Sequence, residues 1–104
     1  MANSYKRIEA VRKTGEILKC LAHQKDPVTA PVISQAVNLP TPTVMCHLST
    51  LEELGFVQSV GDRWRVGMGL GLMWARVKSH LEGERDRVSR DLESIEIKES
   101  GDGE

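Results

Sequence analysis

The sequence predicts a mainly α-helical protein with a small β-hairpin and a further helix towards its C-terminal end. Apolar residues recur at helical intervals through residues 8–54, and two proline-containing turns interrupt them. A short stretch around Gly61 then alternates apolar and polar residues, which is typical of a two-stranded hairpin. A chain of 104 residues can bury one modest core, so one main domain is expected.

The first helix is expected to begin after Ser4, whose hydroxyl suits an N-cap. Gly15 is a weak point inside this helix, since glycine costs about 1 kcal/mol relative to alanine there. Asp26 precedes a proline and therefore ends the helical segment. The apolar stripe of this helix consists of Ile8, Val11, Ile17, Leu18 and Leu21.

A short second helix is predicted to follow, with Thr29 as its N-cap and Pro31 in its first turn. Asn38 suits the left-handed exit of this helix, because asparagine tolerates a positive φ. Leu39 and Pro40 then form a tight turn into the next helix.

The third helix is predicted over residues 41–54, with Thr41 as its N-cap and Pro42 in the first helical position. Gly55 ends it in the position that favours a left-handed residue. One apolar stripe runs along the helix at intervals of four, three and three residues, through Val44, Leu48, Leu51 and Leu54.

A β-hairpin is expected next, with strands over residues 56–60 and 63–66 joined by a turn at Gly61 and Asp62. Two helices joined by a tight turn and followed by a hairpin predict a winged helix-turn-helix. We assign this DNA-binding domain to residues 1–67.

A C-terminal helix is predicted over residues 68–97, with a disordered tail over residues 98–104. Gly83 is a candidate break, and Met73 and Trp74 are expected to cover the core. Four apolar residues repeat with a period close to eleven residues, at Val77, Leu81, Val88 and Leu92. This helix is interpreted as a dimerisation element; the alternative is a helix that only covers the core.

Positive charge is concentrated in the N-terminal part of the chain. The whole sequence has 14 basic and 15 acidic residues, a net charge of −1. Residues 1–65 hold 8 basic and 6 acidic side chains, a net +2, whereas residues 66–104 hold 6 and 9, a net −3. This balance argues against a strongly basic coat protein but agrees with a DNA-binding domain at the positive end.

The sequence gives no support to an enzyme, a metal protein or a membrane protein. Two cysteines, Cys20 and Cys46, predict small, partly buried residues in a reducing compartment. No cysteine or histidine spacing is typical of a metal site, and no nucleophile is organised around His80 and Glu82. With no membrane-length apolar run and no signal peptide, we expect a cytoplasmic protein without catalytic residues, metal or cofactor.

The outward surface of the third helix is the candidate reading surface for DNA. Hydroxyls can bond phosphates or base edges, methyl groups can pack on thymine, and His47 could donate to guanine. The alternative is a solvated polar face, or one that meets a protein. The residues of this surface are Thr41, Thr43, Met45, Cys46, His47, Ser49 and Thr50.

Two further sets of basic residues could hold the DNA backbone. Arg63 and Arg65 alternate with Trp64 in a predicted strand and so leave the same face, towards phosphates or a minor groove. Trp64 is interpreted as a core residue, and the two arginines are alternatively ordinary surface residues. At the N-terminal end, two interpretations remain: contacts to the DNA backbone, or an ordinary solvated helix face. The residues concerned are Lys6, Arg7, Arg12 and Lys13.

The stretches "LPTPTVMCHLSTLEELGFV" and "RWRVGMGLGLM" resemble the DNA-binding domain of IclR-type transcriptional regulators. The resemblance covers about residues 4–75 and implies a winged helix-turn-helix whose third helix enters the major groove. The residues that fit the family pattern are Leu39, Pro40, Thr43, Val44, Leu48, Leu51, Leu54, Gly55, Val57, Arg63, Trp64, Arg65 and Gly67.

The sequence departs from that family in two respects. Cys46 stands where the family has an arginine, so a bidentate arginine contact to guanine is not available there. The family also carries a larger C-terminal ligand-sensing domain that this sequence does not show, so we expect no small-molecule effector. The resulting hypothesis is a transcriptional regulator that binds double-stranded DNA as a homodimer. The alternative is a protein-interaction module that assembles a complex without specific DNA binding.

Overall fold

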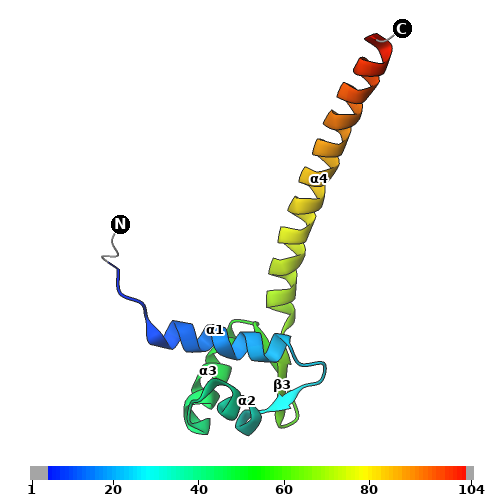
Figure 1. Ribbon diagram of the computed structural model, residues 1–104. Helices are drawn as coiled ribbons and strands as arrows, with labels where there is room; N and C mark the ends of the chain where they lie inside the picture. Colours follow the sequence, from blue (N-terminus) through cyan, green and yellow to red (C-terminus); the bar gives the residue numbers. More distant parts are fainter. Residues whose placement is uncertain (1–4, 103–104) are drawn as a thin grey trace. The chain divides into compact units, whose positions relative to one another are not determined.

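The computed structural model describes residues 5–102 and divides the chain into two units, Met1–Gly71 and Leu72–Glu104 (Figure 1). Within the described residues, the first unit contains three helices, three short strands and the start of a fourth helix, and the second continues that helix to Asp102. The mainly α-helical winged fold is therefore confirmed. None of the helices within residues 5–102 combines the length and the apolar character that crossing a membrane requires.

Helix α1 spans Glu9–Ala22, later than the start expected after Ser4, which itself lies outside the described residues. Ile8 occupies the N-cap position with an extended backbone. Of the expected apolar stripe, Ile17 and Leu21 are buried and Leu18 packs against the core, but the residues near the start of the helix are exposed. The prediction of an apolar stripe was wrong for Ile8 and Val11, which are exposed. Only the second half of α1 contacts the core.

Helix α2 spans Ala30–Val37 and helix α3 spans Thr41–Glu53. The exit of α2 is as expected, since Asn38 has φ 56° and ψ 52°. Thr29 takes the N-cap position of α2 without a capping hydrogen bond from its side chain. The expected cap of α3 was displaced by one residue: Pro40 is the N-cap, and its carbonyl accepts from the Val44 amide at 3.0 Å.

Three short strands form an antiparallel sheet in the order β1-β3-β2, with bounds Val28–Thr29, Arg63–Val66 and Val57–Val60 respectively. The hairpin of β2 and β3 is confirmed, although Phe56 precedes its first strand. Strand β1 was not predicted, because two residues are too short to show an alternating pattern.

The core lies where α1, α2 and α3 meet the sheet. Trp64 of β3 is among the buried residues, which confirms its interpretation as a core residue. Among the residues whose burial the structure describes, the buried apolar ones are Ile17, Leu21, Ala30, Ile33, Val37, Val44, Leu48, Leu51, Val57 and Trp64.

Two glycines allow the backbone of the hairpin exit to lie directly against the corner that follows α3. The Gly67 amide donates to the Phe56 carbonyl at 2.8 Å, and the Gly69 amide donates to the Gly55 carbonyl at 3.0 Å. A Cβ atom at Gly67 or Gly69 would stand 2.6 or 2.7 Å from the Gly55 carbonyl oxygen. No other residue fits at these two positions without moving backbone.

Helix α4 spans Met68–Asp102 and is continuous through Gly83, where a break was expected. One glycine costs about 1 kcal/mol in a helix, and the good helix formers around it outweigh that cost. The helix also includes residues 98–102, which were expected to be disordered, while residues 103 and 104 lie outside the described part. Met73 and Trp74 are 52% and 67% exposed, so the expectation that they cover the core was wrong. All residues that form the core or pack against it precede Gly71.

Candidate nucleic-acid interface

Helix α3 turns a small polar surface outwards. Its inner face is fixed by Val44, Leu48 and Leu51, which are buried at intervals of four and three residues. Of the seven residues proposed for the reading surface, two are half-buried, Thr41 and His47. The exposed ones are Thr43, Met45, Cys46, Ser49 and Thr50.

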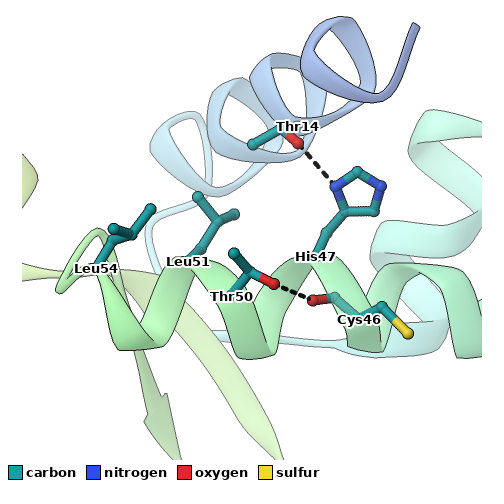
Figure 2. Close-up of a pocket in the computed structure, with 6 residues that line it drawn as sticks. All are labelled: Thr14, Cys46, His47, Thr50, Leu51 and Leu54. Carbon is teal, nitrogen blue, oxygen red and sulfur yellow. Dashed lines mark hydrogen bonds between the residues drawn. The ribbon is translucent and has the colours of Figure 1, made fainter.

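Thr50 is partly committed to its own helix. Its Oγ1 donates to the Cys46 carbonyl at 2.9 Å, one turn earlier (Figure 2). The hydroxyl oxygen therefore keeps its ability to accept a hydrogen bond but has used its only proton. Thr50 can accept from a cytosine or adenine amino group more readily than it can donate to a phosphate.

His47 bonds to the first helix rather than pointing freely outwards. Its Nδ1 lies 2.8 Å from Thr14 Oγ1, and Thr14 Oγ1 also donates to the Ala10 carbonyl at 2.8 Å (Figure 2). The donor in the Thr14–His47 pair depends on the imidazole tautomer: where the single Thr14 proton goes to the Ala10 carbonyl, His47 Nδ1 donates to Thr14. A neutral His47 then carries a bare Nε2, which accepts a hydrogen bond. In that tautomer Nε2 accepts from a base, whereas the donation to guanine expected from the sequence needs a proton on Nε2.

Thr14 was not among the residues proposed from the sequence. A signal for it exists, since Thr14 stands three residues before Ile17 and seven before Leu21, on the inward face of α1. Thr14 of α1 and His47 of α3 face each other in a groove of about 240 Å³ between the two helices (Figure 2). The other residues of the groove are Cys46, Thr50, Leu51 and Leu54.

The two cysteines have different environments. Cys20 is half-buried, as predicted, and burial raises the pKa of its thiol. Cys46 is exposed on α3, so the prediction of partial burial was wrong for it. The intervals of four and three residues that bury Val44, Leu48 and Leu51 place Cys46 on the opposite side of the helix.

The wing presents both of its arginines to solvent. Arg63 and Arg65 are exposed on either side of buried Trp64, so they share a face of β3. Arg63 Nη1 donates to the Pro27 carbonyl at 3.4 Å, and Arg65 Nε donates to Gln58 Oε1 at 3.0 Å. These contacts hold the side chains along the sheet and leave most of each guanidinium for other acceptors.

A hydrogen bond connects the wing to the end of α3. Ser59 Oγ of β2 donates to Glu52 Oε2 at 2.8 Å. The same carboxylate lies next to exposed Glu53, so the C-terminal end of α3 is acidic. Phosphate contacts are therefore unfavourable at this end of the helix and are expected from the wing and from the earlier turns of α3.

The basic residues near the N-terminal end divide into two groups. Lys6 and Arg7 are exposed and precede α1. Arg12 is also exposed, with Glu9 at 3.8 Å. Lys13 is half-buried: its Nζ donates to the Val37 carbonyl at 2.8 Å and lies 3.3 Å from Glu16 Oε1, so it connects α1 to the end of α2.

Comparison with known proteins gives one family match. A family model described as the IclR helix-turn-helix domain matches residues 10–61, half of the chain. This stretch contains α1, α2, α3, β1 and β2. No curated protein matches the chain.

Solved structures of bacterial regulators are similar to the chain. An IclR transcriptional regulator from Alicyclobacillus acidocaldarius is 25% identical, with a TM-score of 0.64 over 69% of this chain and 30% of its own. The repressor BlcR of Agobacterium tumefaciens is 25% identical, with a TM-score of 0.58 over 69% and 29%. An IclR family regulator from Brucella abortus shares the fold at 22% identity and a TM-score of 0.57, over 75% and 32%. The chain thus spans about a third of the length of these proteins.

Proposed function

Because this chain belongs to the IclR helix-turn-helix family, we propose that it is a transcriptional regulator that binds specific double-stranded DNA sequences as a homodimer. The observation that carries the proposal is that α3 exposes a polar face, while the wing, which is bonded to the end of α3 through Ser59 and Glu52, exposes two arginines. This is the arrangement in which one helix enters the major groove and the wing contacts the neighbouring backbone.

The proposal divides attraction and discrimination between two elements. Arg63 and Arg65 supply attraction to phosphates, which depends on salt but not on sequence. Lys6 and Arg7 add to this attraction. Discrimination comes from α3: the methyl groups of Thr43 and Met45 suit a thymine methyl, and the bare Nε2 of His47 suits the amino group of adenine or cytosine.

Mobility-shift titrations against random and genomic duplexes at low salt test the proposal. Replacement of Arg63 and Arg65 by alanine should weaken binding on every duplex and reduce the slope of log K against log salt by about 2. A matched control removes the same charge from α4, at Arg90 and Lys98, and should keep the slope. Absence of any shift, including a non-specific one, would contradict the proposal.

The reading role of α3 has a separate test. Thr43→Ala and His47→Ala should change which sequences are selected from a random pool while the salt slope stays constant. Ser79→Ala, on exposed α4, is the control that should leave the selected sequences unchanged. An unchanged selection in both α3 variants would remove sequence reading from this helix.

A second candidate function is protein docking through α3. It is favoured by one observation, the absence of lysine and arginine from Thr41–Glu53 together with exposed Glu52 and Glu53. In that case the wing arginines are solvated surface residues, and the mobility-shift experiment shows no binding at low salt.

A further inference from the structure

The unit Leu72–Glu104 exposes an apolar stripe along one side of α4. Its six residues are 48% to 67% exposed. In a straight α-helix, at about 100° per residue, all six lie within about 30° of one line. They are Trp74, Val77, Leu81, Val88, Leu92 and Ile95.

The intervals between the residues of the stripe are the same whether they are counted from its N-terminal or its C-terminal end. The intervals between its members are three, four, seven, four and three residues, centred between Glu84 and Arg85. A second copy of α4, running in the opposite direction about that point, therefore meets the stripe in register. The apolar layers are Trp74 with the partner's Ile95, Val77 with the partner's Leu92, and Leu81 with the partner's Val88.

The charged residues beside the stripe match the same alignment. In a straight helix these charged residues flank the stripe on its left and on its right. In the antiparallel pair, the left flank of one helix faces the left flank of its partner, and residues at similar positions along the shared axis become neighbours. Each neighbouring pair then has opposite charges: Lys78 with Glu93, Glu82 with Arg85, Arg76 with Asp91, and Glu84 with Arg87. Glu84 and Arg85 each also approach their own copies at the axis, where the partner's Arg87 and Glu82 respectively compensate them.

The parallel alignment lacks this complementarity. In a parallel pair in register, residues of opposite sides meet at equal heights. Like charges then lie together at most heights, because Arg76 meets Lys78, Glu82 meets Glu84 and Asp91 meets Glu93, whereas Glu84 meets oppositely charged Arg85 at the centre. Same-sign pairs destabilise helix association, so the charge pattern selects the antiparallel direction.

We infer that α4 pairs with the α4 of a second copy of this chain, antiparallel and centred between Glu84 and Arg85. The apolar layers extend over about 33 Å of helix, from Trp74 to Ile95. The inference rests on the homodimer of the proposed function and specifies its interface. It requires no DNA, so dimer formation and DNA binding can be measured separately.

Disulfide trapping tests the direction of pairing. Cys20 and Cys46 are first replaced by alanine and serine, and then Val77→Cys or Leu92→Cys is introduced. In the antiparallel pair each new cysteine lies about 22 Å from its own copy, too far for a disulfide, but next to the other new cysteine. We expect oxidation of a mixture of the two variants to give roughly fivefold or more linked dimer than either variant alone.

The alternative results are distinct. Efficient linking of each single variant with itself would overturn the antiparallel arrangement in favour of a parallel one. No linking in any sample, together with a monomer in light scattering, would overturn self-pairing and leave the stripe to a different protein. Mobility shifts of the unmodified chain, which keeps Cys46, report DNA binding independently of either result.

Charge reversal gives a second test that does not depend on new cysteines. Lys78→Glu and Glu93→Lys should each raise the dimer Kd about fivefold, as measured by sedimentation equilibrium, and the double variant should restore it. Arg90→Glu is the matched control, because Arg90 lies on the side of α4 opposite the stripe. A double variant weaker than both singles would contradict the pairing, and so would an equal effect of the control.

Discussion

The two units of the chain bury their apolar residues in different ways. Met1–Gly71 places ten apolar residues in a closed core, with Ile17, Ile33, Val44 and Leu48 fully buried. Leu72–Glu104 is a helix whose large apolar residues are all about half exposed or more. The first unit can therefore be stable by its own contacts, whereas the stripe of the second gains burial only from another molecule.

The largest expected difference between the units is in the cost of a truncated leucine. Leu48→Ala removes a fully buried side chain and should lower the free energy of unfolding by about 2–5 kcal/mol. Leu92→Ala removes one that is 53% exposed and should change it by less than about 0.5 kcal/mol at low protein concentration. Urea titrations monitored by Trp64 fluorescence measure both. Equal losses would show that α4 has a buried environment of its own.

The next effect concerns the glycines at the junction of hairpin and α4. Gly67→Ala places a methyl group 2.6 Å from the Gly55 carbonyl oxygen and should destabilise the first unit by about 1–3 kcal/mol. Gly71→Ala is the matched control, since nothing lies within 4 Å of its Cβ position and alanine favours a helix. Thermal unfolding should thus shift down for the first variant and slightly up for the second. A neutral Gly67→Ala would contradict the close backbone contact.

A smaller effect is expected where α1 and α3 are joined by Thr14 and His47. Thr14→Val keeps the shape of the side chain but leaves the half-buried Nδ1–H of His47 without its acceptor, which should cost about 1 kcal/mol. Thr14→Ser keeps the hydroxyl and should restore most of that loss in urea titrations. If both variants are equally stable, the hydrogen bond contributes nothing to the packing of the two helices.

The smallest effect is chemical and leaves the fold unchanged. Maleimide should modify exposed Cys46 before half-buried Cys20, whose raised thiol pKa lowers its thiolate fraction at neutral pH. Because burial raises the pKa of the Cys20 thiol, the labelling rate of Cys20 should increase only at a pH above the usual pKa of a cysteine thiol. Mass spectrometry of the time course separates the two sites. If α3 faces DNA, the singly modified protein should also lose its mobility shift.

The sequence predicted the elements that depend on strong local signals. Asn38 and Gly55 mark two helix ends because both positions need a positive φ, and the spacing of Val44, Leu48 and Leu51 determined the buried face of α3. Strand β1 was missed because its pairing with β3 joins residues far apart in the sequence, Val28 with Trp64 and Thr29 with Arg63, and leaves no local pattern. The exposure of Trp74 was missed because a helical pattern identifies an apolar face but not what covers it.

The candidate site was predicted less completely than the fold. The order of residues shows that Arg63 and Arg65 share a face, since alternation is a property of any strand. It does not show that His47 bonds to Thr14, which needs the packing of two helices. That contact determines which ring nitrogen is available to a base, so this part of the chemistry depends on tertiary structure.

The continuity of α4 through Gly83 gives the helix a fixed length per residue. In the proposed antiparallel pair, the two Leu72 residues stand about 37 Å apart along the helix axes. Deleting one residue between Leu72 and Glu84 shortens the separation of the two Leu72 residues by about 3 Å and turns each of them by about 100° about its helix axis, so this separation is encoded in helix length.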